Sequence, residues 1–179
     1  MCQAVTIRKE NQFDYNRVFD LTQKAFETLE ISDHNEGKLV EKLRKAPTFI
    51  DELSLVAEIS GQVVGHILFT PIIIESGKQQ YQSLVLAAVS VLPEFQKKGI
   101  GGLLIHAGHQ KAIELGYQSA ILLGHPDYYP RFGYKSASTF GIKTHLELPS
   151  DDVFMAVELT EGALSQVSGM VIFPPEFGE

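Results

Sequence analysis

The stretch of sequence that decides the fold is Val89-Ser90-Val91-Leu92-Pro93-Glu94-Phe95-Gln96-Lys97-Lys98-Gly99-Ile100-Gly101-Gly102. An apolar strand pattern precedes it, and a helical pattern follows it as far as Leu115. The first turn of a helix has N–H groups without intrahelical partners and carries the positive end of the helix dipole. Glycines let such groups approach a phosphate, and two lysines add positive charge nearby. The stretch therefore predicts a phosphate or pyrophosphate site where a strand leads into a helix.

Two common nucleotide-binding loops do not fit this stretch. A Walker loop needs Gly-Lys followed by Ser or Thr, and the sequence has no such triplet. A dinucleotide fingerprint needs a third glycine where this chain has Leu104. It also needs an acidic residue about 20 positions further on, where this chain has Ser119 and Ala120, neither of which is acidic. What remains is the spacing Q-x-x-G-x-G, from Gln96 to Gly101, after V-x-V-x-P. The alternative is a glycine-rich helix start that binds no ligand.

The segments on either side of the loop predict a β-α-β unit. The strand 85–91, a helix 99–115 closed by Gly116, and the fully apolar strand 120–123 follow one another. The two strands of such a unit should be parallel. Upstream, the strands 54–59, 63–74 and 79–91 are joined by tight turns and should pair antiparallel.

The rest of the chain adds a strand at 4–8, a helix from Asp14 as N-cap to about Leu29, and a second helix at 36–45. Downstream we expect a short helix or turn after Pro126, then strands at 134–136 and 153–159. The predicted fold class is α/β, with a mostly antiparallel mixed sheet, one central parallel strand pair and flanking helices. We expect one domain over 1–179, with a core of about 4–159 and a C-terminal extension of about 160–179.

Composition limits the function. The chain has 179 residues, 44% of them hydrophobic, and a formal net charge of -7 without a basic run, so we expect no nucleic-acid partner. One cysteine, Cys2, excludes an intramolecular disulfide. No apolar run is long enough for a secretory signal or a membrane span, which predicts a cytoplasmic protein without a membrane partner. His106 and His109 lie three apart on a helix, but no third ligand is evident, so we expect no metal. The sequence leaves a homodimer open.

A second motif, L-G-H-P-x-Y-Y-P-R-F-G-Y, runs from Leu123 to Tyr134. Together with the Q-x-x-G-x-G loop, it resembles the GNAT superfamily of N-acetyltransferases, and specifically its YhbS-like branch. Segments 53–58, 63–69 and 173–177 agree with that branch, so the resemblance spans nearly the full length. One departure is Leu122, which stands where many members of the superfamily carry an asparagine.

The resemblance implies an acyltransferase that moves the acetyl group of acetyl-CoA to a primary amine, by direct attack in a ternary complex. It implies that the strand before the loop, 85–91, is bulged and separates from its parallel neighbour near Ser90, so that its backbone can pair with the pantetheine arm of the coenzyme. It also implies that Tyr129 protonates the leaving thiolate as general acid, while Tyr128 is a packed aromatic. The implied coenzyme-binding residues are Val89, Ser90, Val91, Gln96, Lys97, Lys98, Gly99, Ile100, Gly101 and Gly102.

The general base is less evident. His125, at the end of the parallel strand, is the candidate, and Glu58 and Glu30 are alternatives. His66 is predicted to be a core histidine with a backbone partner. Two other functions stay open: a catalytically silent sensor or regulatory module that binds acetyl- or acyl-CoA, and an acyltransferase that uses longer acyl chains. The resemblance implies a small-molecule or peptide amine as the acceptor, and we expect its recognition by the N-terminal helices and by loops 28–35 and 140–149.

Overall fold

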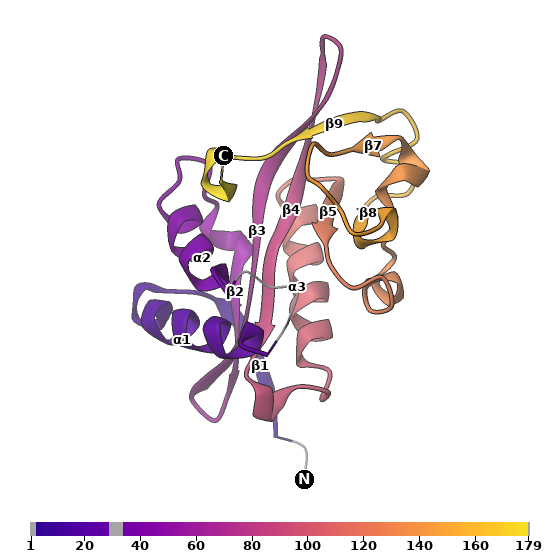
Figure 1. The fold of residues 1–179 in the computed structure, drawn as a ribbon. Helices are drawn as coiled ribbons and strands as arrows, with labels where there is room; N and C mark the ends of the chain where they lie inside the picture. Colours follow the sequence, from indigo (N-terminus) through magenta and orange to yellow (C-terminus); the bar gives the residue numbers. More distant parts are fainter. Residues whose placement is uncertain (1–2, 29–33, 179) are drawn as a thin grey trace. The chain divides into compact units, whose positions relative to one another are not determined.

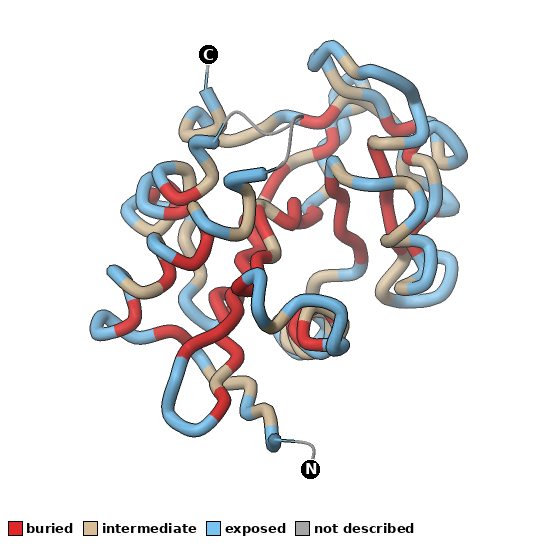
Figure 2. Tube along the Cα trace, turned by 60° about the horizontal axis from the view of Figure 1, so that its bottom comes forward, coloured by how far each residue is buried: buried red, intermediate tan, exposed pale blue. Residues whose placement is uncertain are grey.

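The computed structural model describes residues 3–28 and 34–178 (Figure 1). Within it, the chain divides into two units. The first unit is Met1–Phe69 with Ala87–Lys111, and the second is Thr70–Leu86 with Ala112–Glu179. Two long strands, β3 (Gln62–Ser76) and β4 (Gln79–Val91), pass from one unit into the other. Buried residues are found in both units (Figure 2).

In the first unit, an antiparallel sheet is built from neighbouring strands. β1 (Val5–Lys9) pairs with β2 (Ser54–Ile59), and β2 pairs with β3 around a bulge at Ala57/Glu58. Just past the end of β4, the Leu92 N–H donates to the Val64 carbonyl of β3 at 2.9 Å. The predicted strands are therefore confirmed, and so is the antiparallel pairing of the first two, β2 and β3.

Helices of the first unit cover opposite faces of this sheet. A Cβ built on Gly65 of β3 points at Ile100 and Leu104 of α3 (Ile100–Glu114). Successive strand residues point to opposite faces. The next residue, His66, accordingly lies on the other side, among residues linked to α2 (Glu36–Arg44).

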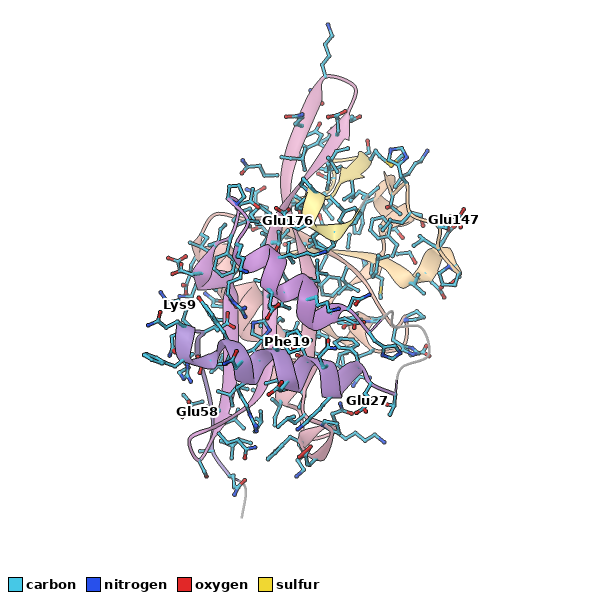
Figure 3. All side chains as sticks on the ribbon, turned by 60° about the vertical axis from the view of Figure 1, so that its left-hand side comes forward. Lys9, Phe19, Glu27, Glu58, Glu147 and Glu176 are labelled. Carbon is cyan, nitrogen blue, oxygen red and sulfur yellow. The ribbon has the colours of Figure 1, made fainter. Side chains whose placement is uncertain are left out.

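α1 (Tyr15–Phe26) lies beside α2 (Figure 3). The Phe19 ring of α1 lies 3.0 Å from the position that a Cβ on Gly37 of α2 would take. The Gln23 side chain accepts a hydrogen bond from the Gly37 N–H at 3.1 Å. A small residue on one helix thus allows close packing of the two helices.

The start of α1 keeps the predicted N-cap residue but gives its side chain another role. Asp14 stands at the N-cap position of α1, as predicted, but its side chain makes no capping hydrogen bond to the helix. Asn11 caps the 3-10 turn that precedes α1, Gln12–Asp14: its side chain accepts from the Phe13 N–H at 2.9 Å. The Asp14 carboxylate instead accepts from the Asn11 N–H and from the Arg8 guanidinium, at 2.8 and 2.9 Å. These hydrogen bonds, the one from Arg8 first, lower the pKa of Asp14. The predicted end at Leu29 lies outside the described residues.

The second unit contains the predicted parallel pair. β4 pairs with β5 (Ser119–Leu123) at Leu84↔Ala120 and Val85↔Ile121, and β5 pairs antiparallel with β8 (Phe154–Glu158). β6 (Lys135–Ser136) pairs with β8 on its other side. The core of this unit is Ile72, Ile74, Val85, Ile121, Ala137, Ile142, Phe154, Ala156, Leu164 and Val171.

Two short segments on either side of β5 are turns: the end of α3 and the segment after Pro126. Gly116, with φ +92°, donates to the Ile113 carbonyl, and Tyr117 donates to the Ala112 carbonyl, which closes α3 as predicted. The element expected after Pro126 is a single 3-10 turn, Tyr129–Phe132.

Two strands of the second unit were not predicted. β9 (Gly169–Ile172) pairs antiparallel with β3, with Ile73 opposite Ile172, and β7 (Ile142–Lys143) pairs parallel with β9. β7 and β9 thus form a second, short parallel pair. Gly169 has φ +131°, and a side chain there would overlap the Glu75 carbonyl of β3. This close backbone approach needs glycine.

Candidate functional site

The loop after β4 is tied back to its own strand. The Gln96 side-chain amide donates to the Val91 carbonyl at 2.9 Å. Pro93 begins a short 3-10 turn, in which the Phe95 N–H donates to the Leu92 carbonyl at 2.8 Å. The glutamine of Q-x-x-G-x-G therefore fixes where the chain turns from strand to helix.

The backbone then twists into the left-handed region twice, with φ +63° at Lys97 and +84° at Gly99. The Gly99 carbonyl accepts the first helical bond, from the Leu103 N–H at 3.1 Å. The N–H groups of Ile100, Gly101 and Gly102 consequently lie in the first turn, where a helix offers no carbonyl partner.

Of the three residues in this turn, two have no side chain. Ile100 is 2% exposed and anchors the helix in the core, while the next two residues are glycines. Lys97 and Lys98 are exposed beside it, with the Lys98 Nζ 5.5 Å from the Phe95 ring centroid. Helix dipole, amide groups and lysines together suit an anion.

The strand before the loop uses its side chains for packing. Ser90 is 2% exposed, and its hydroxyl lies 3.2 Å from the hydroxyl of Thr22 in α1. Val91 is buried and Val89 is half-buried. Among the described residues, parallel pairing of β4 with β5 ends at Val85, earlier than the predicted separation near Ser90.

In the second unit, Tyr129 is held by small and aromatic neighbours. A Cβ on Gly124 would overlap the Tyr129 ring, 3.1 Å from Cδ2. The Tyr129 ring meets the rings of Tyr128 and Tyr134 edge-on, at centroid distances of 5.0 and 5.9 Å. Burial raises the pKa of Tyr129 well above its usual value, so the phenol holds its proton at neutral pH.

Tyr128 has different surroundings. The Arg131 guanidinium carbon lies 4.7 Å from its ring centroid, and the Phe132 ring lies edge-on at 5.3 Å. The Tyr128 N–H donates to the carbonyl of His125 at 3.2 Å. The His125 side chain is exposed in the turn that follows β5. The structure thus brings His125, Tyr128 and Tyr129 together in the second unit, and Val89–Gly102 together in the first.

Of the other base candidates, Glu58 is engaged in an ion pair. The Glu58 carboxylate accepts from the Arg8 guanidinium at 2.9 Å, and Glu30 lies outside the described residues. His66 is fully buried, and its partner is a side chain rather than the predicted backbone group: Nε2 lies 2.9 Å from the Ser54 hydroxyl. Burial lowers the pKa of His66 to about 4, so its ring is neutral.

The Ser54 hydroxyl fixes which nitrogen of the His66 ring carries the proton. It donates to the Glu10 carboxylate at 2.6 Å, so it accepts from Nε2–H of His66. Glu10 is also bound by the Arg44 guanidinium at 2.6 Å. Sequence reasoning did not find this buried network, since its members come from distant segments.

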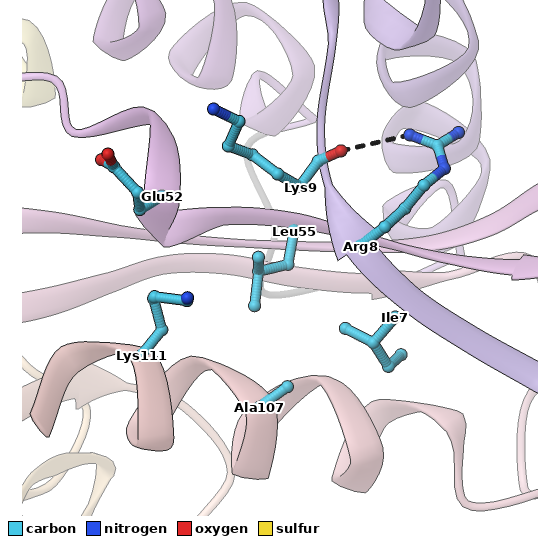
Figure 4. Close-up of a pocket in the computed structure, with 7 residues that line it drawn as sticks. All are labelled: Ile7, Arg8, Lys9, Glu52, Leu55, Ala107 and Lys111. Carbon is cyan, nitrogen blue, oxygen red and sulfur yellow. Dashed lines mark hydrogen bonds between the residues drawn. The ribbon is translucent and has the colours of Figure 1, made fainter. Parts of the chain in front are cut away.

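A separate pocket in the first unit lies between strands β1 and β2 and helix α3 (Figure 4). It is lined by Ile7, Arg8, Lys9, Glu52, Leu55, Ala107 and Lys111. None of the predicted site residues lines it. Within residues 3–28 and 34–178, no group of three or more His, Cys, Asp or Glu side chains is arranged to hold a metal ion. In the same residues, no helix combines the length and the apolar composition needed to cross a membrane.

The fold and the loop define an α/β protein in which a glycine-rich loop joins a strand to a helix. The family described as "Acetyltransferase (GNAT) domain" matches residues 6–137. The chain therefore belongs to the GNAT acetyltransferase family, and it is an acyltransferase.

Relatives agree with this. The uncharacterized N-acetyltransferase YhbS of Escherichia coli is 28% identical over 96% of this chain and 97% of YhbS. The chain is also 37% identical to the uncharacterized N-acetyltransferase YjhQ of Escherichia coli, over 63% of this chain and 62% of YjhQ, so the match spans less than two thirds of that relative.

Solved structures show the same fold. The YhbS crystal structure in complex with CoA has a TM-score of 0.87 and 26% identity, covering 99% of this chain and 93% of YhbS. A GNAT family acetyltransferase from Brucella melitensis in complex with acetyl-CoA has a TM-score of 0.79 and 33% identity, covering 99% of this chain and all 100% of that one. The predicted YhbS-like branch and mixed-sheet fold are thus confirmed.

Proposed function

We propose that this protein transfers the acetyl group of acetyl-CoA to a primary amine, by direct attack of the amine in a ternary complex. The observation that carries the proposal is the first turn of α3, which contains the glycine pair Gly101-Gly102 and follows left-handed backbone at Lys97 and Gly99. The CoA and acetyl-CoA complexes of the two structural relatives support acetyl-CoA as the co-substrate.

The binding roles follow from local geometry. The N–H groups of Ile100, Gly101 and Gly102 bind the pyrophosphate, and Lys97 and Lys98 supply positive charge. Gln96 holds the loop against β4 through the Val91 carbonyl. The backbone of Val89, Ser90 and Val91 binds the pantetheine arm, while the Ser90 side chain packs against Thr22.

The chemistry needs a proton donor and a route for a proton to leave. The amine nitrogen attacks the thioester carbon, and the C–S bond breaks as the tetrahedral intermediate collapses. Tyr129 keeps its proton at neutral pH and donates it to the leaving sulfur. His125, exposed and close to Tyr129 in sequence, is the proposed acceptor of the amine proton, directly or through water.

Coenzyme binding tests the proposal directly. Gly101→Asp places a carboxylate in the first turn of α3, and calorimetry should show CoA affinity reduced by about 100-fold or more, since two negative groups would compete for one site. Gln110→Asp is the matched control, because it adds the same charge to an exposed position of the same helix. Equal CoA affinity in wild type and Gly101→Asp would overturn the site.

Activity separates the proposal from a binding module. A panel of amines, assayed by release of the CoA thiol, should include at least one that is acetylated. Tight CoA binding without turnover on any amine would instead indicate a sensor. Turnover with longer acyl-CoA donors in preference to acetyl-CoA would indicate a different acyl donor.

A further inference from the structure

Gly65 of β3 lies under the first two turns of α3. A Cβ at this position would lie 3.0 Å from Leu104 Cδ1 and 3.4 Å from Ile100 Cγ2. It would also lie 3.2 Å from the Ser90 carbonyl oxygen of β4. All three distances are shorter than or at the lower edge of ordinary van der Waals contact, so a methyl group at Gly65 would require its neighbours to shift.

The small residue is matched to large ones on the helix. Ile100 and Leu104 are 2% and 0% exposed, so their side chains fill the space over Gly65. Further along the same helix the arrangement is reversed, because Gly108 lies against the Phe69 ring, 3.1 Å from Cδ2 to a built Cβ. Gly65 therefore sets how closely the N-terminal part of α3 approaches β3, and Gly108 does so for a later turn.

A side chain at 65 would displace the helix rather than the strands. β3 is held by backbone hydrogen bonds, among them Leu92 N–H to the Val64 carbonyl at 2.9 Å, directly beside Gly65. α3 meets β3 through side chains, which resist displacement less than a paired backbone. Moving Leu104 and Ile100 would move the turn that contains Gly101.

We propose that Gly65 is a positioning residue for the acyl donor: it seats the first turn of α3 at the height above the sheet that pyrophosphate binding requires. The inference depends on the proposed coenzyme site, and it assigns a role to a residue that touches no ligand. A shift of a few tenths of an ångström lengthens hydrogen bonds from three amides at once, and hydrogen-bond strength depends steeply on geometry.

The test compares CoA with pantetheine, which lacks the pyrophosphate. Calorimetry on Gly65→Ala should show CoA affinity reduced by about tenfold or more, while pantetheine affinity, measured by competition, changes less than about twofold. A general loss of structure would reduce both affinities together. Leu104→Ala in the Gly65→Ala background removes the atom that the new methyl group meets and should restore most of the CoA affinity.

Each other result contradicts the inference. Unchanged CoA affinity in folded Gly65→Ala, equal losses for both ligands, or no recovery in the double variant would overturn the positioning role. Failure of both the single and the double variant to fold would assign Gly65 to folding instead. Absence of CoA binding in the wild type would overturn the proposed function itself, and that measurement precedes any comparison of variants.

Discussion

The Tyr129 ring occupies the space that a side chain on Gly124 would need. The two residues belong to one turn after β5, and the absence of a Cβ at 124 lets the ring settle against Tyr134. The position of the proposed proton donor thus depends on a glycine that has no chemistry of its own.

Gly124→Ala should therefore displace the phenol. Overpacking of this kind costs about 1–3 kcal/mol of stability, and a small misplacement of a catalytic group can cost about 100-fold in rate. We expect turnover to fall by at least about tenfold, measured by thiol release, with CoA affinity nearly unchanged. If the effect acts through the hydroxyl, Gly124→Ala should cause little further loss in a Tyr129→Phe background; additive losses would argue against that link.

Removing only the hydroxyl tests the acid directly. Tyr129→Phe should lower turnover by about 100-fold or more, as general acid catalysis commonly contributes that much. CoA affinity should change by less than about tenfold. Tyr128→Phe is the control from the same motif and should be nearly silent, since the Tyr128 ring and backbone N–H make the contacts that hold it in place. Full activity in Tyr129→Phe would remove the tyrosine from the mechanism.

The buried histidine gives a pH-dependent stability. An unfolded His66 binds a proton below about pH 6.5, whereas the folded residue does so only near its pKa of about 4. The unfolded state therefore gains protons first as the pH falls, and His66 lowers the free energy of unfolding between these two values, by up to about 3 kcal/mol.

His66→Gln should flatten that part of the pH profile, because the amide keeps a donor for Ser54 and does not titrate. Denaturant titrations at about pH 7, about pH 5.5 and about pH 4 would measure the difference, since histidine changes charge over this range. The charges of Glu10, Arg44 and Asp14 also shift the pKa of His66, and burial lowers the pKa of His109 as well. All four residues are present in both proteins, so the difference between the two profiles reports on His66 alone. Parallel profiles would show that the pKa of His66 is the same in the folded and unfolded protein.

The loop carries backbone strain at Lys97, whose φ is +63°. Left-handed backbone at a residue other than glycine costs on the order of 1 kcal/mol. Lys97→Gly should raise the free energy of unfolding by about that amount and, at the same time, weaken CoA binding a few-fold by removing a charge. Lys98→Gly is the matched control: it removes the same charge at a residue outside the positive-φ set, so it should bring no gain in stability. A destabilised Lys97→Gly would contradict the strain.

Local patterns were sufficient for much of the fold. Strand 79–91 was predicted with the bounds that the structure gives to β4, and the helix after the loop differs by one residue at each end. Alternating or continuous apolar runs, glycine turns and Pro93 are signals within a few residues of one another, and backbone geometry responds to them locally. The β-α-β unit and its parallel pairing followed from those signals.

Other features depend on partners that are distant in sequence. The N-cap position of α1 followed from the sequence, but the role of its side chain did not: the Asp14 carboxylate is bound by Arg8 of the preceding strand, and Asn11 caps the 3-10 turn before the helix. β9 was missed because a four-residue strand is stabilised mainly by pairing, and its partner β3 lies far away along the chain.

By itself, the sequence determined the strand, the turn and the glycine-rich helix start that define the family, because these are properties of adjacent residues. Only the tertiary structure decided that the Ser54 hydroxyl joins His66 Nε2 to Glu10, and that Gly65 makes room for Leu104. The physical reason is that burial and close packing are set by which surfaces meet, and a residue's own segment does not specify what will cover it.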